Sequence, residues 1–95
     1  MFRFSWDSAK ASTNVRKHGV TFEEAAAVFF DDFGLLYEDP EAAGERRYIL
    51  LGVSNLHRVL VGVHCETGLD GNELRIISAR KATLRERDHY MGGGQ

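Results

Sequence analysis

Three strand-like runs, at residues 46–54, 58–65 and 73–80, follow one another through connections too short to hold a helix. The first connection is Asn55-Leu56-His57, which suits a hairpin. The second, residues 67–72, contains two glycines and an aspartate, which turn the chain sharply. Strands joined by short turns are usually antiparallel neighbours in one sheet. This stretch therefore predicts an antiparallel meander.

Helix signals surround these strands. Asp7 or Ser8 can cap a helix that runs to about His18, and Thr21-Phe22-Glu23-Glu24 is a capping box that opens a second helix to about Phe30. A further capping box, Thr83 to Glu86, opens a last helix that extends to about Met91.

Residues 34–38 read as a fourth strand of the sheet, and residues 2–6 as a short strand or arm. We therefore expect a single α+β domain over residues 1–91, with two N-terminal helices, a four-stranded antiparallel β-sheet and a C-terminal helix. Residues 92–95, Gly-Gly-Gly-Gln, are expected to be a flexible tail.

The net charge of −2 conceals a strong segregation of charge along the chain. Residues 19–45 hold eight acids and no Lys or Arg, whereas residues 75–87 hold five cations and one acid. Such basic segments either attract a polyanion locally or form solvated faces. A lone cysteine, Cys65, and the lack of a signal-peptide core or an apolar run of about 20 residues favour the cytoplasm and exclude a membrane span.

The basic residues of the last strand mark the first candidate site. Arg80 stands just before a helix N-terminus, where it could help to hold a phosphate or could form a salt bridge to one of the acids in residues 19–45. Strict alternation along a strand divides the neighbouring side chains between two faces. It predicts one face with Leu74, Ile76, Ser78 and Arg80, and the other with Glu73, Arg75, Ile77 and Ala79.

Two further groups of residues could carry chemistry. Lys17 and His18 end the first helix, where the histidine suits a general acid or a group that caps backbone carbonyls. Glu45 and Arg47 open one strand and Arg58 opens the next. A carboxylate among guanidinium groups suits a proton acceptor and equally suits a structural ion pair.

Familiar hydrolase motifs are missing from the sequence, which has no GxSxG, P-loop or HExxH pattern and no Cys/His spacing typical of metal ligands. Metal-free RNA cleavage requires only a base for the 2′-hydroxyl, cations for the charge on phosphorus and an acid for the departing 5′-oxygen. The scattered Glu, His, Lys and Arg could supply these parts.

From Phe4 to Tyr90 the sequence closely resembles the BrnT family of toxins from type II toxin–antitoxin modules. The resemblance rests on Phe4-x-Trp6-Asp7, Lys10, Asn14, Lys17-His18-Gly19-Val20, Phe22-Glu23-Glu24-Ala25, Phe29, Glu45-x-Arg47, Gly52, Arg58, Arg75-Ile76-Ile77-Ser78-Ala79-Arg80-Lys81-Ala82, Glu86 and Tyr90. It implies a RelE-like fold and a cytoplasmic, metal-independent endoribonuclease without a cofactor that inhibits translation. It also implies a BrnA-type antitoxin as partner, and the complex would bind DNA through this antitoxin. The expected assembly is either a homodimer of the chain or a toxin–antitoxin hetero-oligomer.

Site residues are carried over from this resemblance position by position. The catalytic candidates are His18, Glu45, Arg47, Arg58 and Arg80, with Glu45 or His18 as base or acid and the arginines as phosphate clamps. The candidates for RNA binding are Lys17, Arg75 and Lys81. The competing interpretation is a binding module without catalysis that serves as a subunit of a DNA-binding repressor, and a purely structural α+β domain is the third.

Overall fold

The computed structural model describes residues 2–92 and contains three α-helices, one 3₁₀ turn and five strands. In chain order they are β1 (Arg3–Ser5), α1 (Ser8–His18), α2 (Phe22–Ala27), the 3₁₀ turn η1 (Val28–Phe30), β2 (Leu35–Glu38), β3 (Tyr48–Val53), β4 (Val59–Thr67), β5 (Glu73–Lys81) and α3 (Leu84–Met91). The flexible tail expected at residues 92–95 lies, apart from Gly92, outside the described residues.

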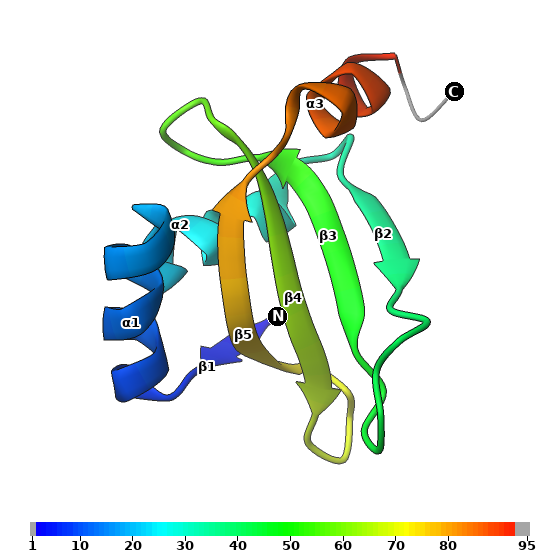
Figure 1. Ribbon diagram of the computed structural model, residues 1–95. Coiled ribbons are helices and arrows are strands. Elements are labelled where there is room, and N and C mark those ends of the chain that lie inside the picture. The colour runs from blue at the N-terminus through cyan, green and yellow to red at the C-terminus, as the bar shows by residue number, and fades with distance from the viewer. Residues whose placement is uncertain (1, 93–95) are drawn as a thin grey trace.

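The sheet has five strands in the order β1-β5-β4-β3-β2 (Figure 1). Strands β2 to β5 form the expected antiparallel meander, but β1 adds a fifth strand that runs parallel to β5. The α+β class is confirmed, whereas the purely antiparallel four-stranded sheet is wrong. The second helix also ends earlier than expected, because α2 stops at Ala27 and continues as the 3₁₀ turn η1.

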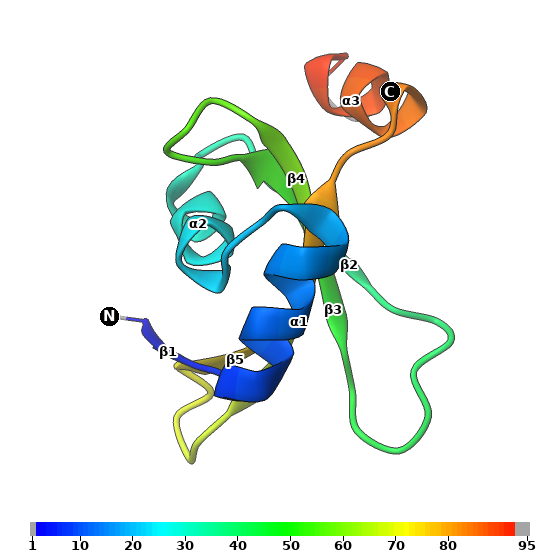
Figure 2. The ribbon, with the colours of Figure 1, turned by 60° about the vertical axis from the view of Figure 1, so that its left-hand side comes forward.

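Helices α1 and α2 leave one face of the sheet uncovered, and α3 reaches over it only at one end. In Figure 1, α2 lies behind the sheet, and the turned view in Figure 2 shows α1 along the β5 edge with α2 on one side. Helix α3 stands beyond the end of the sheet that the β3–β4 turn occupies (Figure 1). The face covered by α2 and η1 is called the covered face below, and the opposite one the open face.

The helix boundaries follow from capping groups. The Asp7 carboxylate accepts the N–H groups of Ala9 and Lys10, and Gly19 ends α1 with a left-handed φ of 67°. At α3, Thr83 and Glu86 form both hydrogen bonds of a capping box. Each boundary thus comes from a few local residues that are visible in the sequence.

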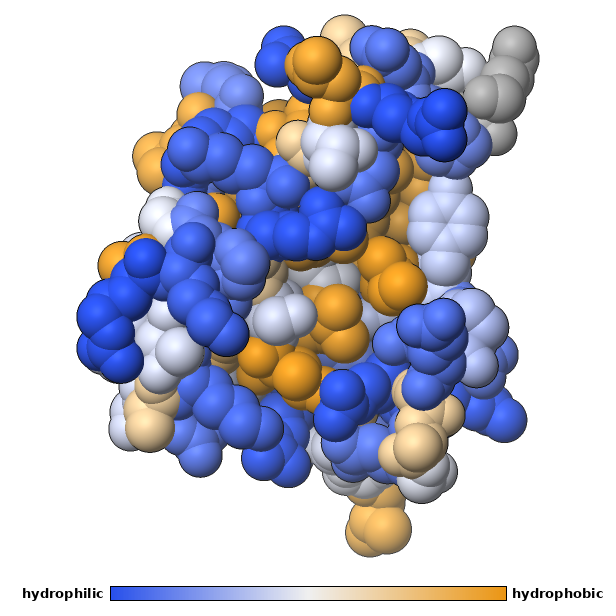
Figure 3. Space-filling model, viewed as in Figure 1, coloured by the Kyte–Doolittle hydropathy of each residue, from blue (hydrophilic) through white to orange (hydrophobic). Residues whose placement is uncertain are grey.

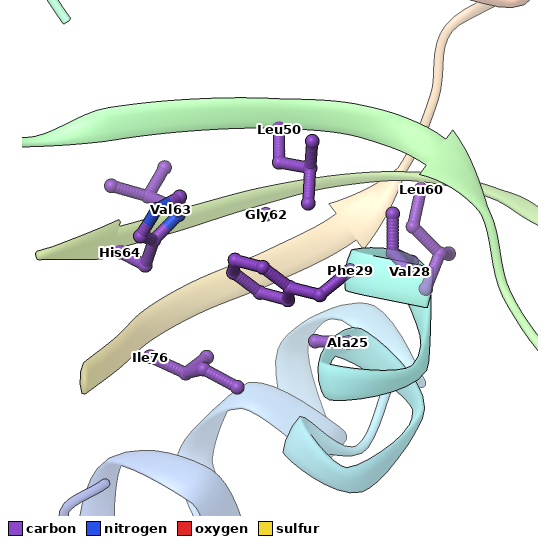
Figure 4. A pocket seen from close by; sticks show the side chains of 9 residues that line it. All are labelled: Ala25, Val28, Phe29, Leu50, Leu60, Gly62, Val63, His64 and Ile76. Atoms are coloured by element: carbon purple, nitrogen blue, oxygen red, sulfur yellow. The ribbon is translucent and has the colours of Figure 1, made fainter. Parts of the chain in front are cut away.

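The hydrophobic core lies between the covered face and the helices. Val20, Phe22 and Leu60 are fully buried there, and Trp6 meets Phe22 edge to face at a centroid distance of 6.0 Å. A residual cavity of only about 10 Å³ remains between α2, η1 and the sheet, and Figure 4 shows the apolar side chains that point into it. That volume is at the lower limit for one water molecule, so the core is close-packed.

His64 of β4 is buried in this core with an exposed fraction of 2%. Its ring stacks on Tyr48 and meets Phe29 edge to face. Burial lowers the pKa of His64 to about 4, because the apolar surroundings disfavour the charged imidazolium. The imidazole is therefore neutral at physiological pH.

Asn14 joins α1 to β5. Its amide nitrogen donates to the carbonyls of Val20 (2.9 Å) and Ala79 (2.8 Å), and its amide oxygen accepts the Ala79 N–H (3.1 Å). Strand β1 pairs with β5 only as far as Arg75, so the Asn14 amide takes the place of a neighbouring strand at Ala79. All three groups are thereby satisfied although they are buried.

Candidate functional site

A β-bulge in β5 decides which residues reach the open face. Val63 pairs with Ser78 but His64 pairs with Ile76, so Ile77 is an extra residue in β5. The alternation therefore reverses, and both Ile76 and Ala79 belong to the core. The prediction that Arg75 and Arg80 lie on opposite faces is wrong.

Both arginines lie on the open face. Arg75 is opposite Cys65 and Arg80 is opposite Val61, and these two β4 residues share one side of the strand. The two arginines are about 13 Å apart along the sheet, since a strand rises about 3.3 Å per residue.

The middle of the open face is apolar. Ile49 and Leu51 of β3 pair with Val63 and Val61 of β4, and their side chains form a floor between the arginines. Figure 3 shows this hydrophobic area surrounded by hydrophilic atoms. An apolar floor with charged residues at both ends suits a flexible polyanion whose bases need a surface to lie on.

Glu45, Arg47 and Arg75 gather at one end of this floor. Arg47 Nη2 lies 3.9 Å from Glu45 Oε1, and both Arg47 and Arg75 act electrostatically on the buried thiol of Cys65 between them. Burial and the adjacent Glu45 carboxylate raise the pKa of the Cys65 thiol. The Glu45 carboxylate is half-exposed and its salt bridge to Arg47 is long, so it is accessible to a bound molecule.

Arg80 stands at the other end, where Glu86 of α3 holds it. Two hydrogen bonds of 2.7 and 2.9 Å join its guanidinium to the Glu86 carboxylate. The Arg80 hydrogen bonds lower the pKa of Glu86 to about 2, against the opposing effect of burial. Glu86 is thus ionised at neutral pH and fixes the Arg80 side chain beside the N-terminus of α3.

Lys17 and His18 flank the open face on the α1 side. They line a groove of about 310 Å³ together with Lys10, Ile77 and Ser78. The bulge contributes to this groove, because it turns Ile77 and Ser78 toward α1. Lys17 and His18 are both exposed. Because Ser78 pairs with Val63 of the open face, the groove that these two predicted site residues line adjoins the surface with Arg75 and Arg80.

A groove of about 580 Å³ lies between α3 and the floor of the open face, and Ile49, Leu51 and Val61 are among its lining residues. Tyr37 of β2 and His89 of α3 line it, and the Tyr37 hydroxyl is 2.8 Å from His89 Nε2. Neither residue was predicted as a site residue from the sequence. The two are 52 residues apart and carry no joint signal in the sequence, so their proximity emerges only from the fold.

Arg58 and Lys81 lie elsewhere. Arg58 forms a hydrogen-bonded ion pair with Glu24, which is 4% exposed and also accepts the Ser54 hydroxyl at 2.7 Å. The Arg58 hydrogen bond lowers the pKa of Glu24, although burial opposes it, and Lys81 adds a weaker electrostatic contribution. Alternation along β4 and β5 places both cations on the covered face, so the structure does not bring them to the Glu45 end of the open face.

The open face therefore offers a carboxylate, several cations and an apolar floor. Among residues 2–92, no three His, Cys, Asp or Glu side chains gather closely enough to hold a metal ion. No helix in the same range is long and apolar enough to cross a bilayer.

Comparisons with known proteins identify the family and a similar fold. Residues 6–86 match the family model described as the ribonuclease toxin, BrnT, of type II toxin–antitoxin systems. The fold is similar to the 1.1 Å crystal structure of the Brucella abortus ribonuclease toxin BrnT, with a TM-score of 0.64 and 23% sequence identity over 88% of this chain and 100% of that one. No curated sequence matches the chain significantly.

Proposed function

This chain belongs to the BrnT family of ribonuclease toxins of type II toxin–antitoxin systems, and from that membership we propose that it cleaves RNA on the open face of its sheet. The observation that carries the proposal is the bulge at Ile77. It places Arg75 and Arg80 on one surface, together with Glu45 and Arg47. Without it, the alternation of β5 would separate the two arginines.

The proposed chemistry assigns one role to each group. Glu45 takes the proton of the 2′-hydroxyl, which then attacks the adjacent phosphorus and expels the 5′-oxygen. Arg47 and Arg75 stabilise the negative charge that grows on the phosphate oxygens. The departing 5′-oxygen takes its proton from water. His18 lies toward the Arg80 end of the sheet, because the carbonyl of the adjacent Gly19 accepts the Arg58 guanidinium, so we assign it to substrate binding beside Lys17.

Substrate positioning uses the rest of the face. Arg80 and Lys17 bind phosphates of nucleotides farther along the RNA, and the half-buried side chains of Ile49 and Val63 support the bases. Arg58 and Lys81 receive no such role in this proposal, because they lie beside Glu24 on the covered face. The base and the cations come from the chain, so we expect the reaction to need neither metal ion nor cofactor.

In the cell, the proposed reaction degrades cytoplasmic RNA and thereby inhibits translation. A type II system pairs its toxin with a protein antitoxin, and a BrnA-type antitoxin is the proposed partner. DNA binding by the complex would come from that antitoxin.

Cleavage of a synthetic RNA by the purified chain tests the catalytic proposal. Glu45→Gln is expected to slow cleavage about 10²- to 10⁴-fold, as the loss of a general base does. Arg75→Ala should slow it about 10²-fold or more through the loss of charge stabilisation. Arg16→Ala is the matched control, because Arg16 is an exposed arginine that bonds within α1 to Ser12 and Thr13.

EDTA in the same assay should leave the rate of the unmodified chain unchanged. An unchanged rate for Glu45→Gln, or equal losses for Arg75→Ala and Arg16→Ala, would remove the open face as the catalytic surface. Circular dichroism of each variant establishes that it is folded.

A second candidate function is a binding module without catalysis. The pairing of Arg58 with Glu24 and of Arg80 with Glu86 favours it, because both guanidinium groups are already neutralised. The same assay separates the two: a binding module retains RNA or a protein partner but leaves RNA uncut with and without added metal ions.

A further inference from the structure

The covered face also carries a hollow that α2 and η1 do not fill. It is a groove of about 240 Å³ between η1 and the sheet, and it is called the aromatic groove below. Its lining includes Phe2, Phe29, Leu36, His64, Asp31 and Glu66. It lies on the side of the sheet opposite to Arg75 and Arg80, because Leu36, His64 and Glu66 alternate with the residues of the open face.

Apolar side chains are concentrated and exposed around this groove. Phe2 is 45% exposed, Leu36 55% and Phe30 71%. The rings of Phe2, Phe4, Phe29 and Phe30 form one cluster, with centroid distances between 5.2 and 6.3 Å. Single exposed apolar residues are ordinary, but a cluster of aromatic rings beside a groove is typical of a protein interaction site.

The charge of the groove selects the partner. Asp31 and Glu66 are among its lining residues, which include no Lys or Arg. Asp32, which follows Asp31, is also exposed. Nucleic acid and anionic lipid would be repelled here, whereas a basic polypeptide would be attracted.

We propose that the aromatic groove is the anchoring site for the antitoxin, through a segment that presents apolar side chains flanked by Lys or Arg. The identity of the partner rests on the proposed function, while the chemistry of the segment comes from the groove. The apolar side chains fill the space beside Phe29 and Leu36. The flanking cations pair with Glu66 and with the exposed Asp32 at the end of η1, whereas the Asp31 carboxylate already accepts hydrogen bonds from Phe33, Val53 and Tyr90.

The location of the groove separates two functions on one small domain. A segment in the aromatic groove leaves Glu45, Arg47 and Arg75 uncovered, because these residues lie on the opposite face. Anchoring and inhibition are therefore different contacts of the antitoxin. Substitutions in the groove should weaken the complex without reducing the RNA cleavage of the free chain.

The experiment measures the affinity of the purified chain for the BrnA-type antitoxin by isothermal titration calorimetry. The double variant Phe30→Ser/Leu36→Ser removes two exposed apolar side chains. We expect it to weaken the affinity for the antitoxin by about tenfold or more. Glu66→Lys should also weaken binding, with a larger effect at low salt, since salt screens the charge interaction. Leu69→Ser is the matched control, because Leu69 is fully exposed in the turn between β4 and β5.

The outcomes are distinct. Affinity that is unchanged in the double variant and in Glu66→Lys overturns the proposal, as does an unmodified chain that fails to bind the antitoxin. If the unmodified chain is a dimer that the double variant abolishes while antitoxin affinity stays constant, a second copy occupies the groove and the proposal is wrong. If groove variants weaken binding but the unmodified chain cuts no RNA, docking is supported and the catalytic proposal fails by itself.

Discussion

Asn14→Ala should destabilise the protein more than an ordinary helix substitution. The Asn14 side chain is 6% exposed and makes three hydrogen bonds to the backbone of Val20 and Ala79. Alanine would leave two carbonyls and one N–H without partners in a buried place. The change acts on the attachment of α1 to the sheet rather than on the helix itself.

The magnitude follows from these three bonds. Each hydrogen bond contributes about 1 kcal/mol net, and an unpaired buried group costs about 1–3 kcal/mol. The higher helix propensity of alanine returns about 0.5 kcal/mol. We therefore expect a loss of about 3 kcal/mol in the free energy of unfolding, which lowers the melting temperature by about 12–24 °C in a domain of this size.

Thermal and urea unfolding followed by circular dichroism measure this loss. Ser12→Ala is the control on the same helix, because Ser12 is exposed and accepts only the Arg16 guanidinium. Its effect should stay within about 0.5 kcal/mol. A loss below about 1 kcal/mol for Asn14→Ala would refute the view that this amide replaces a strand at the edge of β5.

Asn14→Asp tests which part of the amide matters. A carboxylate can still accept the Ala79 N–H, but it cannot donate to the carbonyls of Val20 and Ala79. It should therefore destabilise at neutral pH at least as much as alanine. An aspartate variant as stable as the unmodified chain would contradict the assigned donor role.

Two further predictions concern the core. Phe29→Ala should cost about 3 kcal/mol, because it removes the ring that packs on Phe4 and His64, and an unchanged urea midpoint would contradict this packing. Burial lowers the pKa of His64 from 6.5 to about 4, so between these values the unfolded chain binds a proton that the folded chain excludes. Stability should consequently fall as the pH drops from about 7 to 4, and the fall should be shallower in His64→Phe; equal slopes of melting temperature against pH would exclude His64 as the cause.

Local signals predicted much of the fold. The caps at Asp7, Thr21 and Thr83 act within a few residues, so the starts of all three helices are visible in the sequence. Short turns likewise predicted the antiparallel pairing of β3, β4 and β5. The parallel pairing of β1 was missed because its partner lies at the other end of the described chain, and three residues carry too little pattern to identify it.

The candidate site was less predictable. The bulge at Ile77 adds one residue without any glycine or proline to mark it, so strict alternation placed Arg75 and Arg80 on opposite faces. Arg58 looked like a phosphate clamp because its partner Glu24 is 34 residues away in the sequence. Partners of charged residues depend on long-range packing, which periodicity does not encode.

The edge of β5 is held by the beginning of the chain, through β1 at Glu73 to Arg75 and through Asn14 at Ala79. These contacts close loops of more than 60 residues, so they cost much entropy and form late in folding. While the N-terminal segment is detached, β5 presents an unpaired row of backbone groups that accepts the same segment from another molecule equally well. Refolding at high protein concentration therefore favours domain-swapped pairs, in which each molecule lends its first helix and strand to the other.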